Sequence, residues 1–319
     1  MSRRQVAQHV GYLGPRGTFS EEALLTQVDL RSHELVPYGS FSEIFDALES
    51  NAIDRGFVAI ENSIEGTVLP NLDSLIFNYS FLIQREVVLP IHQQLLGLES
   101  ASLAEVTTIY SYPHASAQCR NFLAQTFSDI EVVATNSTAQ AAEFVAERGD
   151  PSCAAIAPLT NASLHGLKIL ARDIEDFSNN QTRFVLLARD TIPEPSGNDK
   201  TSIVCFQLAD RPGSLMGIVE SFARRSINLT KLESRPTKRV IGEYCFVIDF
   251  VGHVTDPIII ECLQELVQES NRIKFLGSYP ASERISTSDL ATSASAALEG
   301  LDTTIEWITQ LRQHSNRVQ

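Results

Sequence analysis

The sequence predicts an α/β protein in which a larger domain of alternating strands and helices precedes a smaller domain of order β-α-β-β-α-β. Three observations support this. Residues 9–190 alternate short apolar runs with amphipathic segments, residues 191–200 are rich in proline, glycine and polar side chains, and residues 201–280 contain six elements in a different order. Alternating strands and helices are typical of parallel sheets, and the second order is the ferredoxin-like arrangement.

The first half of the larger domain contains three predicted strands and two predicted helices. The strands are apolar runs that end in glycine or polar residues, at 9–14, 34–39 and 55–63. One helix is predicted at 20–28 with Ser20 as its N-cap. The other is predicted at 40–51, where Ser40 and Glu43 form a capping box.

The second half of this domain repeats the pattern, which predicts a duplicated lobe. Strands are predicted at 107–112, 131–137 and 153–158. Helices are predicted at 115–127 and at 138–149, the second ending at a glycine. A late strand at 182–189 can return to one of the two lobes.

The composition TIPEPSGNDK predicts a linker at 191–200. In the smaller domain, strands are predicted at 201–209, 228–237, 242–252 and 273–280, and helices at 214–226 and 256–270. Residues 281–319 predict a polar tail rich in Ser, Thr and Ala, followed by an amphipathic helix with apolar residues at helical spacing from Leu298 to Leu311.

Composition excludes several classes of protein. The net charge of −14 argues against nucleic acid or an anionic membrane as a partner. No apolar run approaches the roughly 18 residues of a spanning helix, and the N-terminus has no apolar signal region. The five cysteines show no metal-ligand spacing. We expect them to be buried thiols of a cytoplasmic protein that needs no metal or cofactor.

Polar segments follow the strands of the larger domain, where parallel sheets bind ligands, so we expect these loops to face one cleft. GPRGTFS offers an anion seat of backbone N–H groups with the Thr18 and Ser20 hydroxyls, although a simple capped turn explains it equally well in isolation. Glu61 and Asn62 follow an apolar strand, where they are either a polar pair at the cleft or merely solvated.

Thr182, Arg183 and Phe184 begin the late strand and offer a hydroxyl, a carboxylate-binding fork and an apolar wall. An ordinary strand start explains the same spacing. His114 lies in a loop between strand and helix, where a cap is the commoner role. No Ser/His/Asp set is visible, so the sequence gives no support for hydrolysis.

Six segments together resemble the prephenate dehydratase family in the family's own order over residues 9–280. They are GYLGPRGTFS, VAIENSIEGTV, IHQQLLG, YSYPHASAQC, NNQTRF and LESRP. The resemblance implies a two-lobed catalytic domain like a periplasmic binding protein at 9–190, followed by an ACT domain at 201–280. It also implies a monofunctional enzyme that converts prephenate to phenylpyruvate, water and carbon dioxide.

The resemblance further implies site residues. The threonine of TRF is essential in the family, which makes Thr182 a positioned hydrogen-bond donor to the leaving oxygen, with Arg183, Phe184, Glu61 and Asn62 beside it. Further substrate-binding residues, besides Thr18 and Ser20, are Ser111, Gln118, Asn136, Ser137 and Thr138. Two positions depart from the family: Asn136 stands where some members carry an acid, and Tyr112 stands where many carry histidine.

The second domain resembles ACT domains that bind phenylalanine. This implies effector contacts from the turn Gly213, Ser214 and Leu215, and from Glu233, Ser234, Arg235 and Pro236 of LESRP. The serine in the turn departs from the family's Gly-Ala-Leu. ACT domains usually pair, so the resemblance implies a homodimer or homotetramer, which the alternating apolar strand at 242–252 can support.

Two alternatives remain open from the sequence. An arogenate dehydratase shares the fold and chemistry, and turnover of the two substrates would separate it. A non-catalytic amino-acid sensor belongs to another class, and the intact TRF and ENS segments argue against it.

Overall fold

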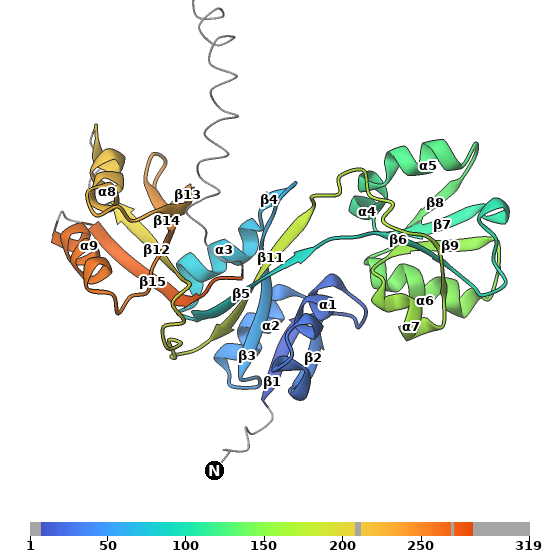
Figure 1. The fold of residues 1–319 in the computed structure, drawn as a ribbon, viewed down its shortest axis with the longest axis horizontal. Coiled ribbons are helices and arrows are strands. Elements are labelled where there is room, and N and C mark those ends of the chain that lie inside the picture. The colour runs from blue at the N-terminus through green and yellow to red at the C-terminus, as the bar shows by residue number, and fades with distance from the viewer. Residues whose placement is uncertain (1–7, 208–211, 269–270, 283–319) are drawn as a thin grey trace, which may run out of the picture. The chain divides into compact units, whose positions relative to one another are not determined.

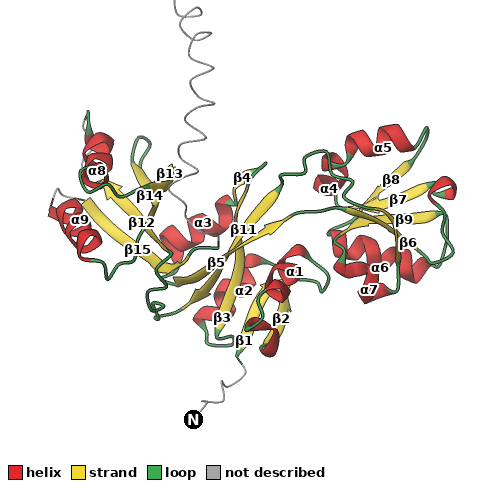
Figure 2. Cartoon of the chain, in the orientation of Figure 1, coloured by secondary structure: helices red, strands yellow, loops and turns green. Residues whose placement is uncertain are grey.

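The computed structural model describes residues 8–207, 212–268 and 271–282, which form three sheets covered by helices (Figures 1 and 2). The predicted polar tail and its amphipathic helix lie outside these residues. None of the helices in the described residues combines the length and the apolar character that crossing a bilayer requires.

The first sheet has the order β2-β1-β3-β11-β5, with β4 paired to β3. Its strands are β1 (His9–Leu13), β2 (Glu34–Tyr38), β3 (Arg55–Asn62), β4 (Gly66–Thr67), β5 (Leu82–Pro90) and β11 (Gln181–Ala188). Its helices are α1 (Phe19–Thr26), α2 (Phe41–Glu49) and α3 (Leu69–Asp73), followed by a π-helical turn at Ser74–Asn78.

The second sheet has the order β10-β6-β9-β7-β8. Its strands are β6 (Gln94–Gly97), β7 (Thr108–Ser111), β8 (Glu131–Ala134), β9 (Cys153–Ala157) and β10 (Lys168–Ala171). Its helices are α4 (Pro113–Gln118), α5 (Arg120–Thr126), α6 (Thr138–Arg148) and α7 (Thr160–His165). Two lobes of similar pattern are therefore present, as the sequence predicts.

The alternation of strands and helices predicts parallel sheets, and both sheets contain parallel pairs, but both are mixed. Strand β1 pairs in parallel with β2 and β3, and β7 pairs in parallel with β8 and β9. Strand β11 instead runs antiparallel between β3 and β5, which returns the late strand to the first lobe. Strand β6 runs antiparallel to β9 and β10 in the second lobe.

Two predictions about helices, the N-cap of the first helix and the single helix at 115–127, are wrong, and hydrogen bonds explain both differences. Helix α1 begins after Thr18, whose extended backbone and side-chain oxygen cap it, so Ser20 lies inside the helix rather than at its N-cap. The single helix predicted at 115–127 is interrupted at Cys119. The Gln118 carbonyl accepts from the Asp176 N–H at 2.6 Å, and the Asp176 carboxylate accepts from the Asn121 N–H at 3.0 Å, so tertiary bonds replace helical ones there.

The third sheet has the order β13-β14-β12-β15, with all neighbours antiparallel, which confirms the ferredoxin-like arrangement. Its elements are β12 (Asp199–Gln207), α8 (Ser214–Ala223), β13 (Leu229–Pro236), β14 (Tyr244–Val251), α9 (Pro257–Gln268) and β15 (Asn271–Pro280). Helices α8 and α9 cover one face of this sheet (Figure 1). The alternating residues Phe246, Ile248 and Phe250 pack beneath them.

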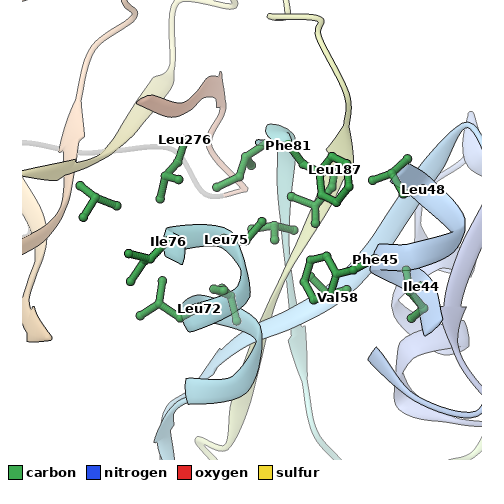
Figure 3. Close-up of a cluster of buried hydrophobic side chains, with 14 of the residues drawn as sticks. Ile44, Phe45, Leu48, Val58, Leu72, Leu75, Ile76, Phe81, Leu187 and Leu276 are labelled. Carbon is green, nitrogen blue, oxygen red and sulfur yellow. The ribbon is translucent and has the colours of Figure 1, made fainter. Parts of the chain in front are cut away.

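The other face of the third sheet shares a hydrophobic core with the first lobe (Figure 3). Val247 and Leu276 of this sheet pack in one cluster with Leu72, Leu75 and Ile76 of the first lobe. Burying a side chain of this size contributes roughly 1.5–3 kcal/mol. Both faces of β14 are therefore covered within the chain, so the apolar face that the sequence offers for an oligomer is occupied by α8 and α9.

Candidate functional site

A cavity of about 500 Å³ is lined by residues of both lobes. The predicted site residues that line it are Thr18, Ser20, Asn62, Gln118, Asn136, Ser137, Thr138, Thr182 and Phe184. They come from loops and strand ends far apart in the sequence. The structure therefore brings the polar segments that follow the strands to one place, as the topology of the sheets leads us to expect.

Strand β11 supplies Thr182 and Phe184 to this cavity because alternate residues of a strand share a face. Thr182 lies opposite Asn62 in the register of β11 and β3, and the Asn62 amide donates to Thr182 Oγ1 at 3.0 Å. The Asn62 side-chain oxygen accepts from the Glu65 N–H at 3.0 Å, which fixes the amide orientation. Phe184 stacks on Phe57 with ring centroids 5.1 Å apart and forms an apolar wall.

A chain of hydrogen bonds leads from this pair across to the second lobe. The Asn62 amide also donates to Asn180 at 2.8 Å, and the Asn180 amide donates to Gln118 at 3.3 Å. The Gln118 amide donates to Glu65 at 3.3 Å, and Glu65 lies 3.0 Å from Nδ1 of His114. The network thus joins the loop after β3, the segment before β11 and helix α4.

Two helix N-termini also contribute to the cavity lining. Helix α1 contributes Thr18 and Ser20, and helix α6 contributes Ser137 and Thr138. An N-terminus favours anions through its free N–H groups and its dipole. No lysine or arginine is present among the described residues that line the cavity. A dianionic ligand would therefore be held by N–H groups and hydroxyls rather than by cationic side chains.

The GPRGTFS turn is held in place by a buried carboxylate. Glu21 accepts from the Gly17 N–H at 2.6 Å and from the Tyr12 hydroxyl at 3.1 Å. Burial and the nearby Glu21 carboxylate raise the pKa of Tyr12, which keeps this hydroxyl a donor. The Asn161 amide of α7 donates to the Gly17 carbonyl at 2.7 Å, which ties this turn to the second lobe.

Arg183 does not line the cavity. Its side chain points to the opposite face of β11, where it donates to Glu86 at 2.8 Å, to Asp249 at 2.7 Å and to the Tyr279 hydroxyl at 2.8 Å. Burial would lower the pKa of Arg183, but Tyr279 and the two carboxylates hold it well above the usual value. This geometry gives no support to the predicted substrate-binding fork, because each of these partners is a protein group.

Two further predicted residues also lie outside the cavity lining. Glu61 and Asn62 are successive residues of β3, so their side chains face opposite sides of the sheet. The Glu61 carboxylate lies on the same side as Arg183, 3.4 Å from its guanidinium and 3.1 Å from Nζ of Lys231. Ser111 is fully buried and donates to the Tyr112 carbonyl at 3.0 Å.

A second cavity of about 540 Å³ lies in the third sheet. The predicted effector residues Gly213, Ser214, Leu215 and Ser234 line it, together with Gln207, Met216, Val219, Tyr244 and Phe246. Glu233, Arg235 and Pro236 do not line it. The side chains of Glu233 and Arg235 face the first lobe instead, bonded to Thr67 and Asp73.

The sequence did not single out Glu65 and Asn180, and it favoured a capping role for His114. The signal for all three was their position within the same polar segments, since Glu65 follows Asn62 by three residues and Asn180 precedes Thr182 by two. Their side chains meet only because the two lobes approach each other.

One group of metal-type ligands is present elsewhere among the described residues, formed by His92, Asp173 and Glu175. The Glu175 carboxylate lies 2.7 Å from His92 Nδ1 and accepts from the Gln93 N–H at 2.8 Å. These contacts explain the cluster, because they join the two segments that connect the lobes, between β5 and β6 and between β10 and β11.

Comparisons with known families agree with this description. A family model described as prephenate dehydratase matches residues 10–192, and one described as ACT domain matches residues 201–268. The chain is 37% identical to a prephenate dehydratase of Mycolicibacterium vanbaalenii over 92% of this chain and 97% of that relative. It is 38% identical to the prephenate dehydratase of Bacillus subtilis over 85% and 98%.

Two solved structures share the fold of this chain over most of its length. A prephenate dehydratase of Arthrobacter aurescens in complex with L-Phe matches with a TM-score of 0.79 and 33% identity, over 92% of this chain and 99% of that one. A protein named GqqA, described as a novel type of quorum quenching acylase, matches with a TM-score of 0.77 and 29% identity, over 86% and 98%.

Proposed function

Since this chain belongs to the prephenate dehydratase family, we propose that it converts prephenate to phenylpyruvate, water and carbon dioxide and that phenylalanine regulates it through the ACT domain. The observation that carries the proposal is one cavity that joins Asn62, Thr182 and Phe184 with the N-termini of α1 and α6. We further propose that residues 9–190 form the catalytic domain and 201–280 the ACT domain, and that the enzyme works in the cytoplasm as a homo-oligomer.

The two carboxylates of prephenate match the two helix N-termini that contribute to the cavity. Ser20 and Thr138 hydroxyls make no hydrogen bond within the described part of the chain, so both are free to donate to substrate oxygens. Apolar side chains such as Phe184 enclose the ring. Holding the substrate between two preorganised donor sets aligns the bonds that break, which is the main catalytic contribution for a reaction driven by aromatisation.

Thr182 is the proposed donor to the leaving oxygen. Its Oγ1 already accepts from Asn62, so its one hydroxyl hydrogen remains available for the substrate. As the ring carboxylate leaves as carbon dioxide, its bonding electrons move through the ring and expel the hydroxyl group. That group takes up a proton from solvent and departs as water, and a hydrogen bond from Thr182 stabilises the charge developing on its oxygen.

The pair formed by Glu65 and His114 joins the two lobes across the cavity. Both side chains are about half exposed or more, at 49% and 63%. An exposed contact of this kind contributes little to stability. We therefore assign this pair to closing the cavity over the substrate rather than to the chemical step.

The cavity at Gly213 and Ser234 is the proposed phenylalanine site. The glycine, with a positive φ of 89°, is the N-cap of α8, and Phe246 supplies an aromatic wall. The complex of the Arthrobacter aurescens relative with L-Phe supports this ligand.

Two other activities are open to test. Arogenate carries an ammonium group in place of the keto oxygen, and Glu65 is the one carboxylate among the described residues that line the catalytic cavity. An acylase, the description of GqqA, needs an activated nucleophile. Among the described residues, His114 bonds to Glu65 and no hydrogen bond joins it to Thr182, so the two do not form a nucleophile–base pair.

The test is to add prephenate, arogenate and an N-acylated amine, the substrate class of an acylase, separately to the purified full chain, with and without phenylalanine. We expect phenylpyruvate from prephenate, less of it with phenylalanine, and little turnover of the N-acylated amine. Preferred turnover of arogenate would reassign the substrate, and turnover of the N-acylated amine alone would refute the proposal. A Ser234→Tyr variant should fill the effector cavity and abolish the inhibition without affecting basal turnover.

A further inference from the structure

Strand β13 contacts the effector cavity and the first lobe at the same time. Ser234 lines the effector cavity, whereas its neighbours Glu233 and Arg235 point the other way, because successive residues of a strand face opposite sides. Arg235 donates to Asp73 at 3.0 Å. Strand β13 therefore borders the cavity at Ser234 with one face and contacts the first lobe with the other.

The contact between β13 and the first lobe is centred on Lys231, Glu233 and Thr67, which we call the β13 contact. Lys231 Nζ lies 3.1 Å from the Glu61 carboxylate and donates to Thr67 Oγ1 at 3.0 Å. The Thr67 hydroxyl in turn donates to Glu233 at 2.6 Å, so donors and acceptors form a closed set. The Lys231 side chain is 12% exposed. Such contacts are less screened by water than surface ion pairs are.

The first-lobe residues of the β13 contact, Glu61 and Thr67, lie next to residues that line the catalytic cavity. Glu61 precedes Asn62 on β3 and lies opposite both Thr67 of β4 and Arg183 of β11. Asn62, on the other face, holds Thr182 and fixes the backbone of Glu65. A displacement of Glu61 or Thr67 toward β13 therefore moves the Asn62–Thr182 pair and the β3–β4 loop with it.

We propose that Lys231 and Glu233 are positioning residues that set the Asn62–Thr182 pair through Glu61 and Thr67, and that they couple this pair to the effector cavity at Ser234. The inference rests on the proposed function. A ligand in the cavity beside Ser234 binds better to one of two positions of β13 and so shifts the population toward that position. The β13 contact then moves the loop that carries Asn62 together with the strand. Neither residue contacts the catalytic cavity.

The experiment compares the full chain with its Lys231→Met, Lys231→Arg and Thr67→Val variants. The measured quantity is the ratio of kcat/KM for prephenate without and with saturating phenylalanine, which is typically about 5–150 for coupled sites. We expect Lys231→Met and Thr67→Val to reduce this ratio to about 1–2 and Lys231→Arg to retain most of it. Calorimetry should show that all three still bind phenylalanine.

Arg224→Met is the matched control, because it removes a more exposed cation of the same domain whose ion pairs go to Glu220 and Glu265. It should keep the wild-type ratio. Full inhibition of both Lys231→Met and Thr67→Val would overturn the inference. So would an equal loss of inhibition in Arg224→Met.

Hydrogen exchange of residues 61–67 gives a second readout that does not depend on turnover. Phenylalanine should change exchange of this segment in the wild-type chain but not in Lys231→Met. If the wild-type chain fails to convert prephenate and still shows this difference, the proposed function fails and the coupling stands. If the wild-type segment does not respond to phenylalanine, the coupling is refuted even where prephenate is converted.

Discussion

Thr182 and Arg183 are neighbours in β11, yet their side chains serve opposite faces of the sheet. Thr182 accepts from Asn62 at 3.0 Å in the catalytic cavity, and Arg183 donates to Asp249 of the ACT sheet at 2.7 Å. The TRF segment therefore combines a residue that lines the cavity, the proposed donor to the leaving oxygen, with a residue that contacts the ACT sheet.

Replacing Thr182 with alanine should lower kcat by about 10²–10³-fold, the usual loss when a hydrogen-bond donor to a developing negative charge is removed. The fold should survive, since the change removes a side chain that lines a cavity. Thr182→Ser should retain substantial activity because it keeps the hydroxyl. Phenylpyruvate formation measures the rate, and turnover near the wild-type level in a folded Thr182→Ala protein would remove Thr182 from the mechanism.

Glu65→Gln should lower kcat/KM for prephenate by about fivefold or less, because an exposed ion pair contributes roughly 0.2–1 kcal/mol. The effect should fall mainly on KM and should shrink at high salt, which screens the pair in the wild-type chain. A loss of more than about a hundredfold in kcat would instead place Glu65 in the chemical step.

Gly17→Ala should impair both stability and activity. Gly17 has φ +85°, and an added Cβ would lie 2.3 Å from Asn161 Oδ1 of the second lobe. Gly149→Ala is the matched control, with φ +65° and no atom within 4 Å of the added Cβ. The left-handed backbone alone costs about 1–2 kcal/mol, so both variants should lower the urea midpoint, but Gly17→Ala alone should raise KM. An unchanged KM would show that the Gly17–Asn161 contact does not shape the cavity.

Arg183→Met should destabilise the chain by about 3–5 kcal/mol, since it leaves the buried carboxylates of Asp249 and Glu86 without their common cation. Arg183→Lys should cost less, because it keeps the charge but loses the planar fork. Urea unfolding measures the loss. A substrate-binding fork would give the opposite pattern, with KM raised and the unfolding free energy unchanged.

Asp249 should make stability depend on pH in the acid range. Burial alone would raise the pKa of Asp249, but Arg183 and the Ser202 hydroxyl hold it below its usual value of 3.8. A depressed folded-state pKa contributes stability above the unfolded value, and that stability is lost as the pH falls through the folded value. The unfolding free energy of Asp249→Asn should therefore fall less steeply below pH 3.8 than that of the wild-type chain. Parallel curves would contradict this assignment.

The sequence predicted the lobes and the gathering of their loops well, because apolar runs such as 153–158 and capped helices such as 138–149 are local signals. It did not predict β5, β6 or β10. These strands run antiparallel near the connections between the lobes, without the helix alternation that marked the others.

The direction in which side chains point was harder to predict from the sequence than the order of the strands and helices. Polar side chains of β11 lie on both of its faces, and the half-buried face of the edge strand β13 carries Lys231, Glu233 and Arg235, so polarity along these strands does not tell which residues face a cavity. Arg183, Glu61, Glu233 and Arg235 were assigned to ligand sites because they lie in recognisable segments, yet the structure pairs them across the contact between the domains.

The hydrophobic core shared by Leu72, Ile76, Val247 and Leu276 limits how this enzyme can escape feedback control. Deleting the ACT domain would expose the first-lobe side of that core, including Leu72 and Ile76, and leave the catalytic lobe prone to aggregation. A lineage selected to overproduce its end product therefore has little access to truncation as a route. We expect resistant strains to carry point substitutions that leave the sensor folded and attached.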